Sequence, residues 1–204
     1  MTMYSPPFYR EERLDVIHRL IDETPFAMLI ADHDGSISHL PLLREGNELL
    51  GHMARANPQW RGLREKPGCR AIFQGPHAYI SPAWYQPQAD NVPTWNYAAA
   101  HARARFTIDE DPVSAYVAME RMVNHFEAKY RTGWVLPRGE AAIEKLMKGI
   151  VVFRLREATY DAKLKLGQKL DPADRQRVID ELDQRGCEMR DVARWMNDNP
   201  LTDR

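Results

Sequence analysis

The sequence GHMARANPQW occupies residues 51–60 and continues a run of apolar residues. The apolar start predicts the end of a β-strand, and the pair Asn57-Pro58 predicts the start of a helix. Asparagine is a favoured N-cap residue, and proline is tolerated at the first helical position because its missing N–H would have no partner there. The segment therefore brings His52, Arg55 and a helix N-terminus to one place. Backbone N–H donors, the positive end of the helix dipole and a guanidinium group favour a bound phosphate, but an ordinary surface turn with an incidental arginine fits the same sequence.

The composition is that of a globular protein without an overall attraction for nucleic acid. The chain has 204 residues, of which 44% are hydrophobic and 28% charged, and its formal net charge is −1. This length favours one domain with a sizeable core, and the balanced charge supplies no field that would attract a polyanion. The two cysteines, Cys69 and Cys187, give no disulfide framework, and no apolar run approaches the roughly 20 residues of a membrane span. We therefore expect a cytoplasmic protein with no membrane association.

Short strand-like segments alternate with turn signals along most of the chain. Asp34-Gly35 is typical of a hairpin turn, and a succession of such strands favours an antiparallel barrel over a doubly wound sheet. We expect strands at residues 26–31, 36–43, 48–54, 69–74, 77–81, 94–108, 150–155 and 159–166. We expect helices at residues 11–22, 58–65, 112–130, 140–148, 172–184 and 188–197.

The longest predicted helix carries large side chains at helical spacing. They are Tyr116, Met119, Val123, Phe126 and Tyr130. An apolar stripe with this period normally faces the protein interior. We therefore interpret these residues as core contacts and not as the lining of a ligand site.

Several common catalytic motifs are missing from the sequence. It contains neither the G-x-G-x-x-G dinucleotide fingerprint nor the phosphate-binding G-x-x-x-x-G-K-[ST] loop. It has no H-E-x-x-H and no C-x-x-C, and its seven histidines are scattered, so we expect no metal site. Ser81 lies in Tyr-Ile-Ser-Pro and not in the G-x-S-x-G elbow of hydrolases. A hydrolase is therefore not expected.

Two further segments combine aromatic, amide and cationic side chains. In NVPTWNY at residues 91–97, strand alternation places Trp95 and Tyr97 on one face and Asn96 on the other. In AKLKLGQK at residues 162–169, a strand-like alternation ends with cations and an amide.

Together these segments resemble the PaiB family of FMN-binding proteins, which are described as negative transcriptional regulators. The resemblance is carried, in the family's order, by M-Y-x-P at residues 3–6, HLPL at 39–42, GHMARANPQW at 51–60, FQGPHAYISP at 73–82, PTWNY at 93–97 and K-L-x-Q at 165–168. It extends beyond residue 180. The sequence departs from the family pattern at Gly167, where the family has serine, and at Lys169, where it has asparagine.

The resemblance implies an α+β, mainly antiparallel fold, in which an FMN-binding split β-barrel carries peripheral helices and a C-terminal helical pair. We expect a single domain over residues 1–204, with the barrel core at residues 24–167 and the C-terminal helices at residues 171–198. The resemblance also implies a homodimer, with the cofactor FMN bound at the subunit interface.

FMN needs cations and N–H donors around its phosphate, and a flat, mainly apolar slot around its ring. We expect Arg55 and Lys165 to supply the charge, and Trp95 to form a wall of the slot. His39 either points into the site or faces solvent. The full set of cofactor-binding candidates is His39, His52, Met53, Arg55, Asn57, Trp95, Asn96, Lys165 and Gln168. No catalytic side chain is assigned.

These expectations favour a flavin-binding transcriptional regulator or sensor of the PaiB type. An FMN-dependent oxidoreductase acting on a small molecule is the alternative, because the flavin would carry the electrons without a protein nucleophile. A haem-binding protein is a third hypothesis and would need an axial ligand such as His52. Direct contact of the C-terminal helices with DNA is disfavoured, because residues 171–204 hold nine acidic and six basic residues, the wrong balance for a phosphate-facing surface.

Overall fold

A computed structural model of the protein describes residues 3–86 and 92–200. Asn91, the first residue of one predicted site segment, lies outside the described residues. The chain forms two compact units, each assembled from separate stretches of sequence. The first unit comprises residues 1–23, 74–101 and 161–204, and the second comprises residues 24–73 and 102–160.

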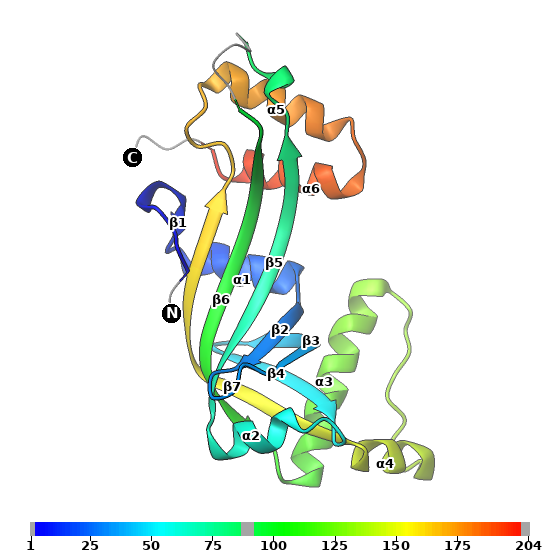
Figure 1. Ribbon diagram of the computed structural model, residues 1–204. Helices are drawn as coiled ribbons and strands as arrows, with labels where there is room; N and C mark the ends of the chain where they lie inside the picture. The colour runs from blue at the N-terminus through cyan, green and yellow to red at the C-terminus, as the bar shows by residue number, and fades with distance from the viewer. Residues whose placement is uncertain (1–2, 87–91, 201–204) are drawn as a thin grey trace. The chain divides into compact units, whose positions relative to one another are not determined.

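Seven strands form one sheet with the order β1-β7-β4-β3-β2-β5-β6. β7 also pairs with β6, so strands β2 to β7 close into a six-stranded barrel to which β1 is added (Figure 1). The β1–β7, β2–β3, β2–β5, β3–β4 and β4–β7 pairings are antiparallel, which confirms the predicted fold class. The strands are β1 (Arg10–Glu11), β2 (Phe26–Ala31), β3 (Ile37–Glu45), β4 (Glu48–Ala54), β5 (Gly68–Ile80), β6 (Thr94–Ile108) and β7 (Ile150–Lys165).

Six α-helices accompany the strands in the described part of the chain. They are α1 (Leu14–Glu23), α2 (Gln59–Glu65), α3 (Pro112–Tyr130), α4 (Ala141–Lys148), α5 (Pro172–Asp183) and α6 (Cys187–Asp198), with short 3-10 turns at Pro7–Tyr9 and Pro82–Trp84. The predicted C-terminal helical pair is present, and α5 lies beside α6 in the first unit (Figure 1). Within residues 3–86 and 92–200, none of these helices combines the length and apolarity that a membrane crossing requires.

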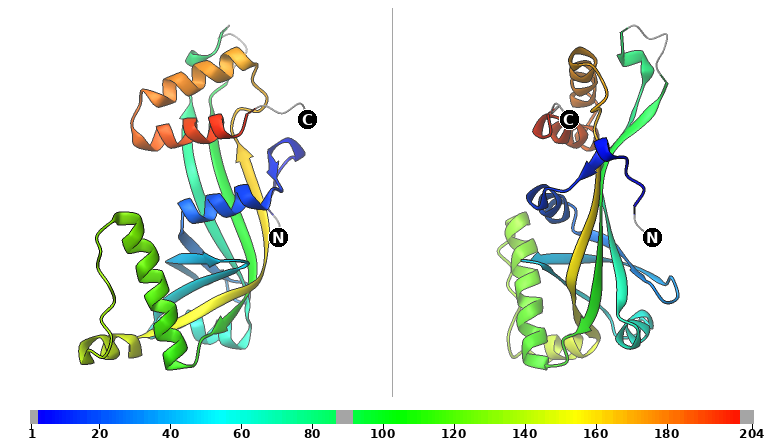
Figure 2. Two further views of the ribbon diagram at one scale, coloured as in Figure 1. Left: turned by 180° about the vertical axis from the view of Figure 1, so that it is seen from behind. Right: turned by 90° about the vertical axis from the view of Figure 1, so that its left-hand side faces the viewer.

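Helix α3 packs on the second unit through small and flexible side chains. Ala118 and Met122 are buried against Leu43, Leu50 and Val152, and α3 contacts β4 within this unit (Figure 2). The helix begins where the sequence predicts, because the Asp111 side chain accepts a hydrogen bond from the Ser114 N–H and caps it.

The stripe predicted to face the core from α3 is only partly correct. Met119 and Phe126 are half-buried against the cluster around Met122. Tyr130, at the end of the helix, is 72% exposed. The buried line therefore runs through Ala118 and Met122, which lie one position away from the larger side chains that define the sequence pattern.

A continuous β5 replaces the two strands predicted on either side of Gly75-Pro76. Gly75 is buried within the strand. A Cβ atom built on Gly75 would lie 2.9 Å from the Ala98 carbonyl oxygen and 2.5 Å from Leu20 Cδ1. Glycine is therefore required because Leu20 on α1 and Ala98 on β6 lie close to the β5 backbone here, and not because the chain turns.

The prediction of two strands at residues 150–155 and 159–166 is also wrong. β7 runs without a break over Ile150–Lys165. Glu157, between the two predicted strands, adopts a φ of 56°, in the left-handed region, and marks a local bend within one strand.

Replacing Gly75 by alanine tests this explanation. The added methyl group must displace either a carbonyl or a buried leucine, so we expect Gly75→Ala to lower the free energy of unfolding by about 1–3 kcal/mol. Chemical denaturation measures the change, and Gln74→Ala at the exposed neighbouring position serves as the control. Equal stability of Gly75→Ala and the wild type would show that the strand has room for a side chain here.

A carboxylate joins α1 to α6 in the first unit. Glu23 accepts hydrogen bonds from both guanidinium groups of Arg19 and Arg194, at 2.8–3.1 Å, and from Trp195 Nε1 at 3.0 Å. Burial raises the pKa of the Glu23 carboxyl, but the hydrogen bonds from Arg194, Arg19 and Trp195 outweigh it and lower the pKa to about 2. The ionised form therefore stabilises the fold.

This pKa predicts an acid-dependent part of the stability. Because the folded-state pKa is below the unfolded value of 4.5, the contribution is complete above that value and is lost as the pH falls towards 2. Glu23→Gln should lower the free energy of unfolding at neutral pH and flatten its decline in this acid range. Denaturation across the pH range checks this, with Glu188→Gln on the exposed face of α6 as control. An unchanged pH profile in Glu23→Gln would contradict the assignment.

Candidate functional site

Arg55 follows β4 directly and bonds to the junction between α4 and β7. Its backbone N–H donates to the Gly149 carbonyl at 2.8 Å. Its side chain donates from Nε to the Lys148 carbonyl at 2.8 Å and from Nη2 to the Ile150 carbonyl at 2.7 Å. These acceptors are neutral, and no carboxylate pairs with Arg55 among the residues that the structure describes. The exposed guanidinium therefore keeps its full positive charge available.

Asn57 shapes the turn that presents Arg55. Its Oδ1 accepts from the Gln59 N–H at 3.0 Å, and its Nδ2 donates to Ser38 Oγ at 2.8 Å. Helix α2 begins at Gln59, one residue later than predicted. The Asn57 side chain accepts from the first N–H of this helix. Trp60 Nε1 donates to the Arg55 carbonyl at 2.9 Å and closes the turn. Both polar atoms of the Asn57 amide are therefore occupied by hydrogen bonds that hold this turn in place.

The remaining second-unit candidates occupy β3 and β4. His52 is half-buried, its Nδ1 is buried without a hydrogen-bond partner, and burial lowers the pKa of the ring, so the neutral form prevails at neutral pH. Met53 lies on the opposite face of the strand and is 5% exposed. His39 is exposed and stacks on Phe26, with ring centroids 6.4 Å apart.

A cavity of about 680 Å³ opens beside Arg55 within the second unit. Its lining comes from α2, the end of β6, α3, α4 and the start of β7. We call it the Arg55 cavity. Its volume lies in the range of about 300–1,000 Å³ that is typical of small-molecule sites. No sequence pattern indicated this cavity, because its lining residues are distant from one another in the chain.

In the first unit, Trp95 and Asn96 point to opposite faces of β6, as the strand alternation predicts. Trp95 is 52% exposed and lies near the rings of His77 and Tyr79, with centroids 6.2 and 6.1 Å away. Asn96 is buried, and its Nδ2 donates to Met196 Sδ at 3.5 Å. Trp95 is therefore available to a ligand in this unit, whereas Asn96 is occupied by a contact with α6.

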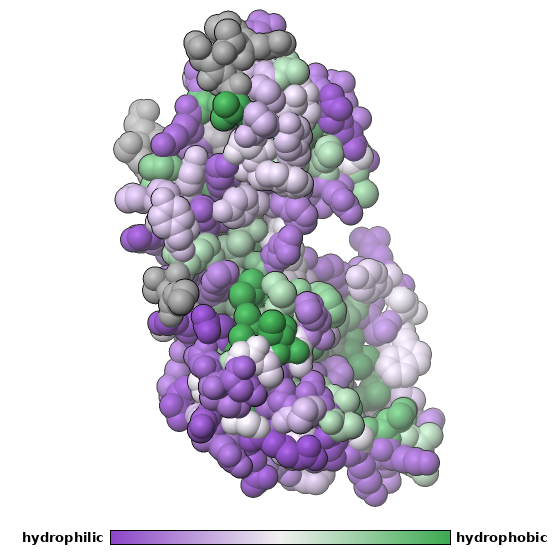
Figure 3. Space-filling model, in the orientation of Figure 1, coloured by the Kyte–Doolittle hydropathy of each residue, from purple (hydrophilic) through white to green (hydrophobic). Residues whose placement is uncertain are grey.

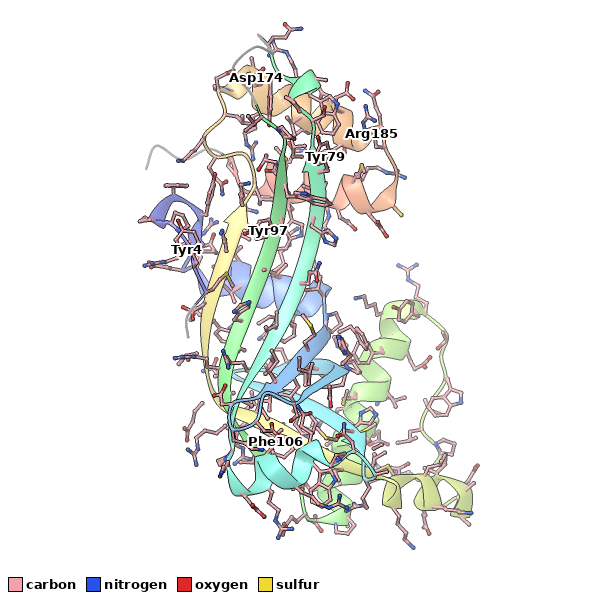
Figure 4. The ribbon with its side chains drawn as sticks, viewed as in Figure 1. Tyr4, Tyr79, Tyr97, Phe106, Asp174 and Arg185 are labelled. Carbon is pink, nitrogen blue, oxygen red and sulfur yellow. The ribbon has the colours of Figure 1, made fainter. Side chains whose placement is uncertain are left out.

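Two lysines lie on the same face of β7. Lys165 is half-buried and donates to Thr94 Oγ1, and burial lowers the pKa of its ammonium group. Lys163, which the sequence analysis did not select, is 8% exposed, and its Nζ lies 5.4 Å from the ring centroids of both Tyr4 and Tyr97 (Figure 4). The alternation Lys-x-Lys was the signal that could have identified it.

Gln168 and Gly167 form the bend that follows β7. Gln168 Oε1 accepts from the Leu166 N–H at 2.8 Å, and its Nε2 donates to the Leu164 carbonyl. Gly167 has a φ of +76°, a conformation that glycine adopts without strain and serine does not. Glycine therefore suits the bend that follows β7.

The residues present fit the requirements of FMN. In the second unit, Arg55 is a cation without a carboxylate partner among the described residues, and His52 has a buried nitrogen without a hydrogen-bond partner. In the first unit, Lys165 is a partly desolvated cation with a hydroxyl partner, and Trp95 offers an exposed ring. An anionic phosphate and a planar ring are the groups that such side chains bind.

The structure places the predicted residues in two groups. His39, His52, Met53, Arg55 and Asn57 belong to the second unit, and Trp95, Asn96, Lys165 and Gln168 belong to the first. Within the groups, Arg55 and Asn57 share one turn, and Lys165 and Gln168 share one strand end. Their joint role in cofactor binding stays a prediction. Over residues 3–86 and 92–200, no group of three His, Cys, Asp or Glu side chains is arranged to hold a metal ion.

The sequence matches a described protein family and a named relative over most of its length. Residues 3–157 match the family described as "Putative FMN-binding domain". The protease synthase and sporulation protein PAI 2 of Bacillus subtilis is 31% identical over 189 residues, which cover 88% of this chain and 89% of that protein.

Solved structures share the fold at low sequence identity. The flavocytochrome Anf3 from Azotobacter vinelandii superposes with a TM-score of 0.62 at 16% identity, covering 83% of this chain and 75% of that one. The FAD and heme binding protein from Mycobacterium smegmatis superposes with a TM-score of 0.58 at 16% identity, covering 82% and 78%. At these identities the likeness establishes the fold alone.

Proposed function

Because this chain belongs to the FMN-binding domain family that its residues 3–157 match, we propose that it is a flavin-binding sensor or transcriptional regulator of the PaiB type. The family match and the barrel fold make it an FMN-binding split-barrel protein. The regulatory role is supported by the 31% identity to the sporulation protein PAI 2. The observation that carries the site is the unpaired charge of Arg55, fixed beside a cavity by two carbonyl groups.

In this proposal each residue has a binding role. Arg55 binds the flavin phosphate while its Nε and Nη2 stay on the Lys148 and Ile150 carbonyls, and Asn57 holds the turn in place. In the first unit, Lys165 offers a cation and Trp95 an exposed ring to a ligand. When bound, FMN supplies reversible electron transfer. A change in the oxidation state of the flavin is the signal that a sensor of this kind reports.

The C-terminal helices offer no support for direct DNA contact. Val178, Leu182, Val192 and Trp195 are fully or almost fully buried on α5 and α6, and residues 171–204 carry an excess of acidic side chains. We therefore propose that regulation proceeds through the flavin site and the assembly of the protein. The assembly we propose is a homodimer with FMN at the subunit interface.

An FMN-dependent oxidoreductase is the second candidate, and the Arg55 cavity favours it. A cavity of substrate size beside the proposed phosphate ligand would admit a small molecule. The flavin would carry the electrons, so the chain would need to bind and orient the substrate without a nucleophile of its own.

Loss of Arg55 should weaken FMN binding. A charge-assisted hydrogen bond contributes about 1.5–3 kcal/mol, so we expect Arg55→Ala to raise the Kd for FMN about 10-fold or more. Flavin fluorescence titration measures the affinity, and native mass spectrometry of the wild type identifies the cofactor and the number of subunits. Arg61→Ala, an exposed arginine on α2 that stacks on Trp60, is the matched control. A wild-type protein that takes up no FMN, or one that shows a haem spectrum, would refute the cofactor assignment.

Reduction kinetics separate the sensor from the enzyme. Under anaerobic conditions an oxidoreductase should lose its flavin absorbance rapidly with NADH or NADPH and regain it with an acceptor. A sensor should show no reduction by either nucleotide on the timescale of turnover. Rapid bleaching and catalytic reoxidation would reject the sensor proposal in favour of the oxidoreductase.

A further inference from the structure

The Arg55 cavity has a chemistry of its own that the binding of a flavin phosphate does not use. We propose that it is a binding site for a small aromatic carboxylate, which shares Arg55 with the proposed phosphate site but is not filled by the flavin itself. The proposal rests on the second unit alone, so it stands or falls independently of the flavin assignment.

The walls of the cavity are mainly apolar and include two aromatic side chains. Val151 and Val152 are almost fully buried at the start of β7, and Met147 is half-buried on α4. Trp60 from α2 and Tyr116 from α3 also contribute to the lining. Apolar and aromatic walls of this kind hold the body of a ring-containing ligand.

Helix α4 has an apolar side that the chain does not cover. None of its residues is fully buried, and Leu146 is 67% exposed. Figure 3 shows hydrophobic residues on the surface over this helix. Met147 is the apolar α4 side chain that lines the cavity. A ligand bound against Met147 would shield apolar surface that is otherwise in contact with water.

The charges around the cavity favour an anion. Arg64 pairs with Glu110 at 3.5 Å, and Arg138 makes two hydrogen bonds to Glu120. Asp109 accepts a hydrogen bond from Ser114 Oγ at 2.6 Å.

Two lining cations remain without a carboxylate partner among the described residues. They are Arg55 and Lys148, whereas Asp109 and Glu144 are the lining acids without a cationic partner in the same described part of the chain. The lining is therefore neutral overall, and its positive charge is local: Arg55 Nε donates to the Lys148 carbonyl, so the two cations come from neighbouring residues that one carboxylate can bind. Arg55 is shared with the proposed phosphate site, so the affinities of the two anions should depend on each other.

Titration calorimetry with 2-naphthoate tests the proposal, with neutral 2-naphthamide as the probe that lacks the charge. Both are titrated into the wild-type protein without flavin and after loading with FMN. We expect saturable binding of one 2-naphthoate per chain in both forms. The amide should bind about 3–10-fold more weakly, as expected for the loss of a partly screened charge pair.

Matched pairs of variants on α4 locate the site. Met147→Asp places a negative charge in the cavity and should weaken 2-naphthoate binding about 10-fold or more, whereas Leu146→Asp lies outside the lining and should leave it unchanged. Lys148→Gln should weaken 2-naphthoate binding about 3–10-fold and leave 2-naphthamide unaffected, whereas Lys145→Gln should change neither. Circular dichroism and FMN uptake confirm that each variant is folded.

Three results would overturn the proposal. The first is no saturable binding of 2-naphthoate, and the second is equal loss of binding in Met147→Asp and Leu146→Asp. The third is stoichiometric displacement of 2-naphthoate by FMN, which would show that the cavity belongs to the flavin itself. None of these results affects FMN uptake by the wild type, whose failure would instead remove the proposed function.

Discussion

The hydrogen bonds from Arg55 to the α4–β7 junction determine what the candidate site can do. Arg55 leaves β4 as an exposed cation, and the Lys148, Gly149 and Ile150 carbonyls hold its side chain and backbone. Because carbonyl groups orient a guanidinium without neutralising it, the charge is both fixed in position and free to bind an anion. A carboxylate in place of these carbonyls would also orient the guanidinium, but it would neutralise the charge that attracts an anion.

The same bonds connect ligand binding to a weakly packed helix. The Lys148 carbonyl is one of the acceptors at the C-terminal end of α4 that have no partner within the helix, and Arg55 satisfies it. Helix α4 itself has no fully buried residue, so few other contacts hold it. An anion bound to Arg55 would therefore lie directly beside the helix that lines the Arg55 cavity.

Local sequence signals predicted much of the fold. The bounds of β2, β4 and β6 follow from apolar runs closed by turn residues, and the start of α3 follows from Asp111-Pro112. β5 and β7 were wrongly divided, since Gly75-Pro76 resembles a turn but marks a close backbone approach, and the bend at Glu157 lies within one continuous strand. Tertiary packing decides such positions, and a single sequence does not contain it.

Only the residues of the candidate site that form a local sequence pattern could be predicted. Arg55 and Asn57 could be selected because a strand end followed by a capping pair is a local pattern. The bonding of Arg55 to α4, the burial of Lys163 and the Arg55 cavity depend on residues that are distant in the sequence. The positive φ of Gly167, which suits glycine, likewise became visible only in the structure.

A crystal structure of the protein with bound FMN tests the central claim most directly. We predict a phosphate oxygen within hydrogen-bonding distance of the Arg55 guanidinium, about 2.7–2.9 Å for a charge-assisted pair, with the Lys148 and Ile150 carbonyls still bound to the same side chain. A phosphate held elsewhere, with Arg55 unchanged on its two carbonyls and facing water, would contradict it.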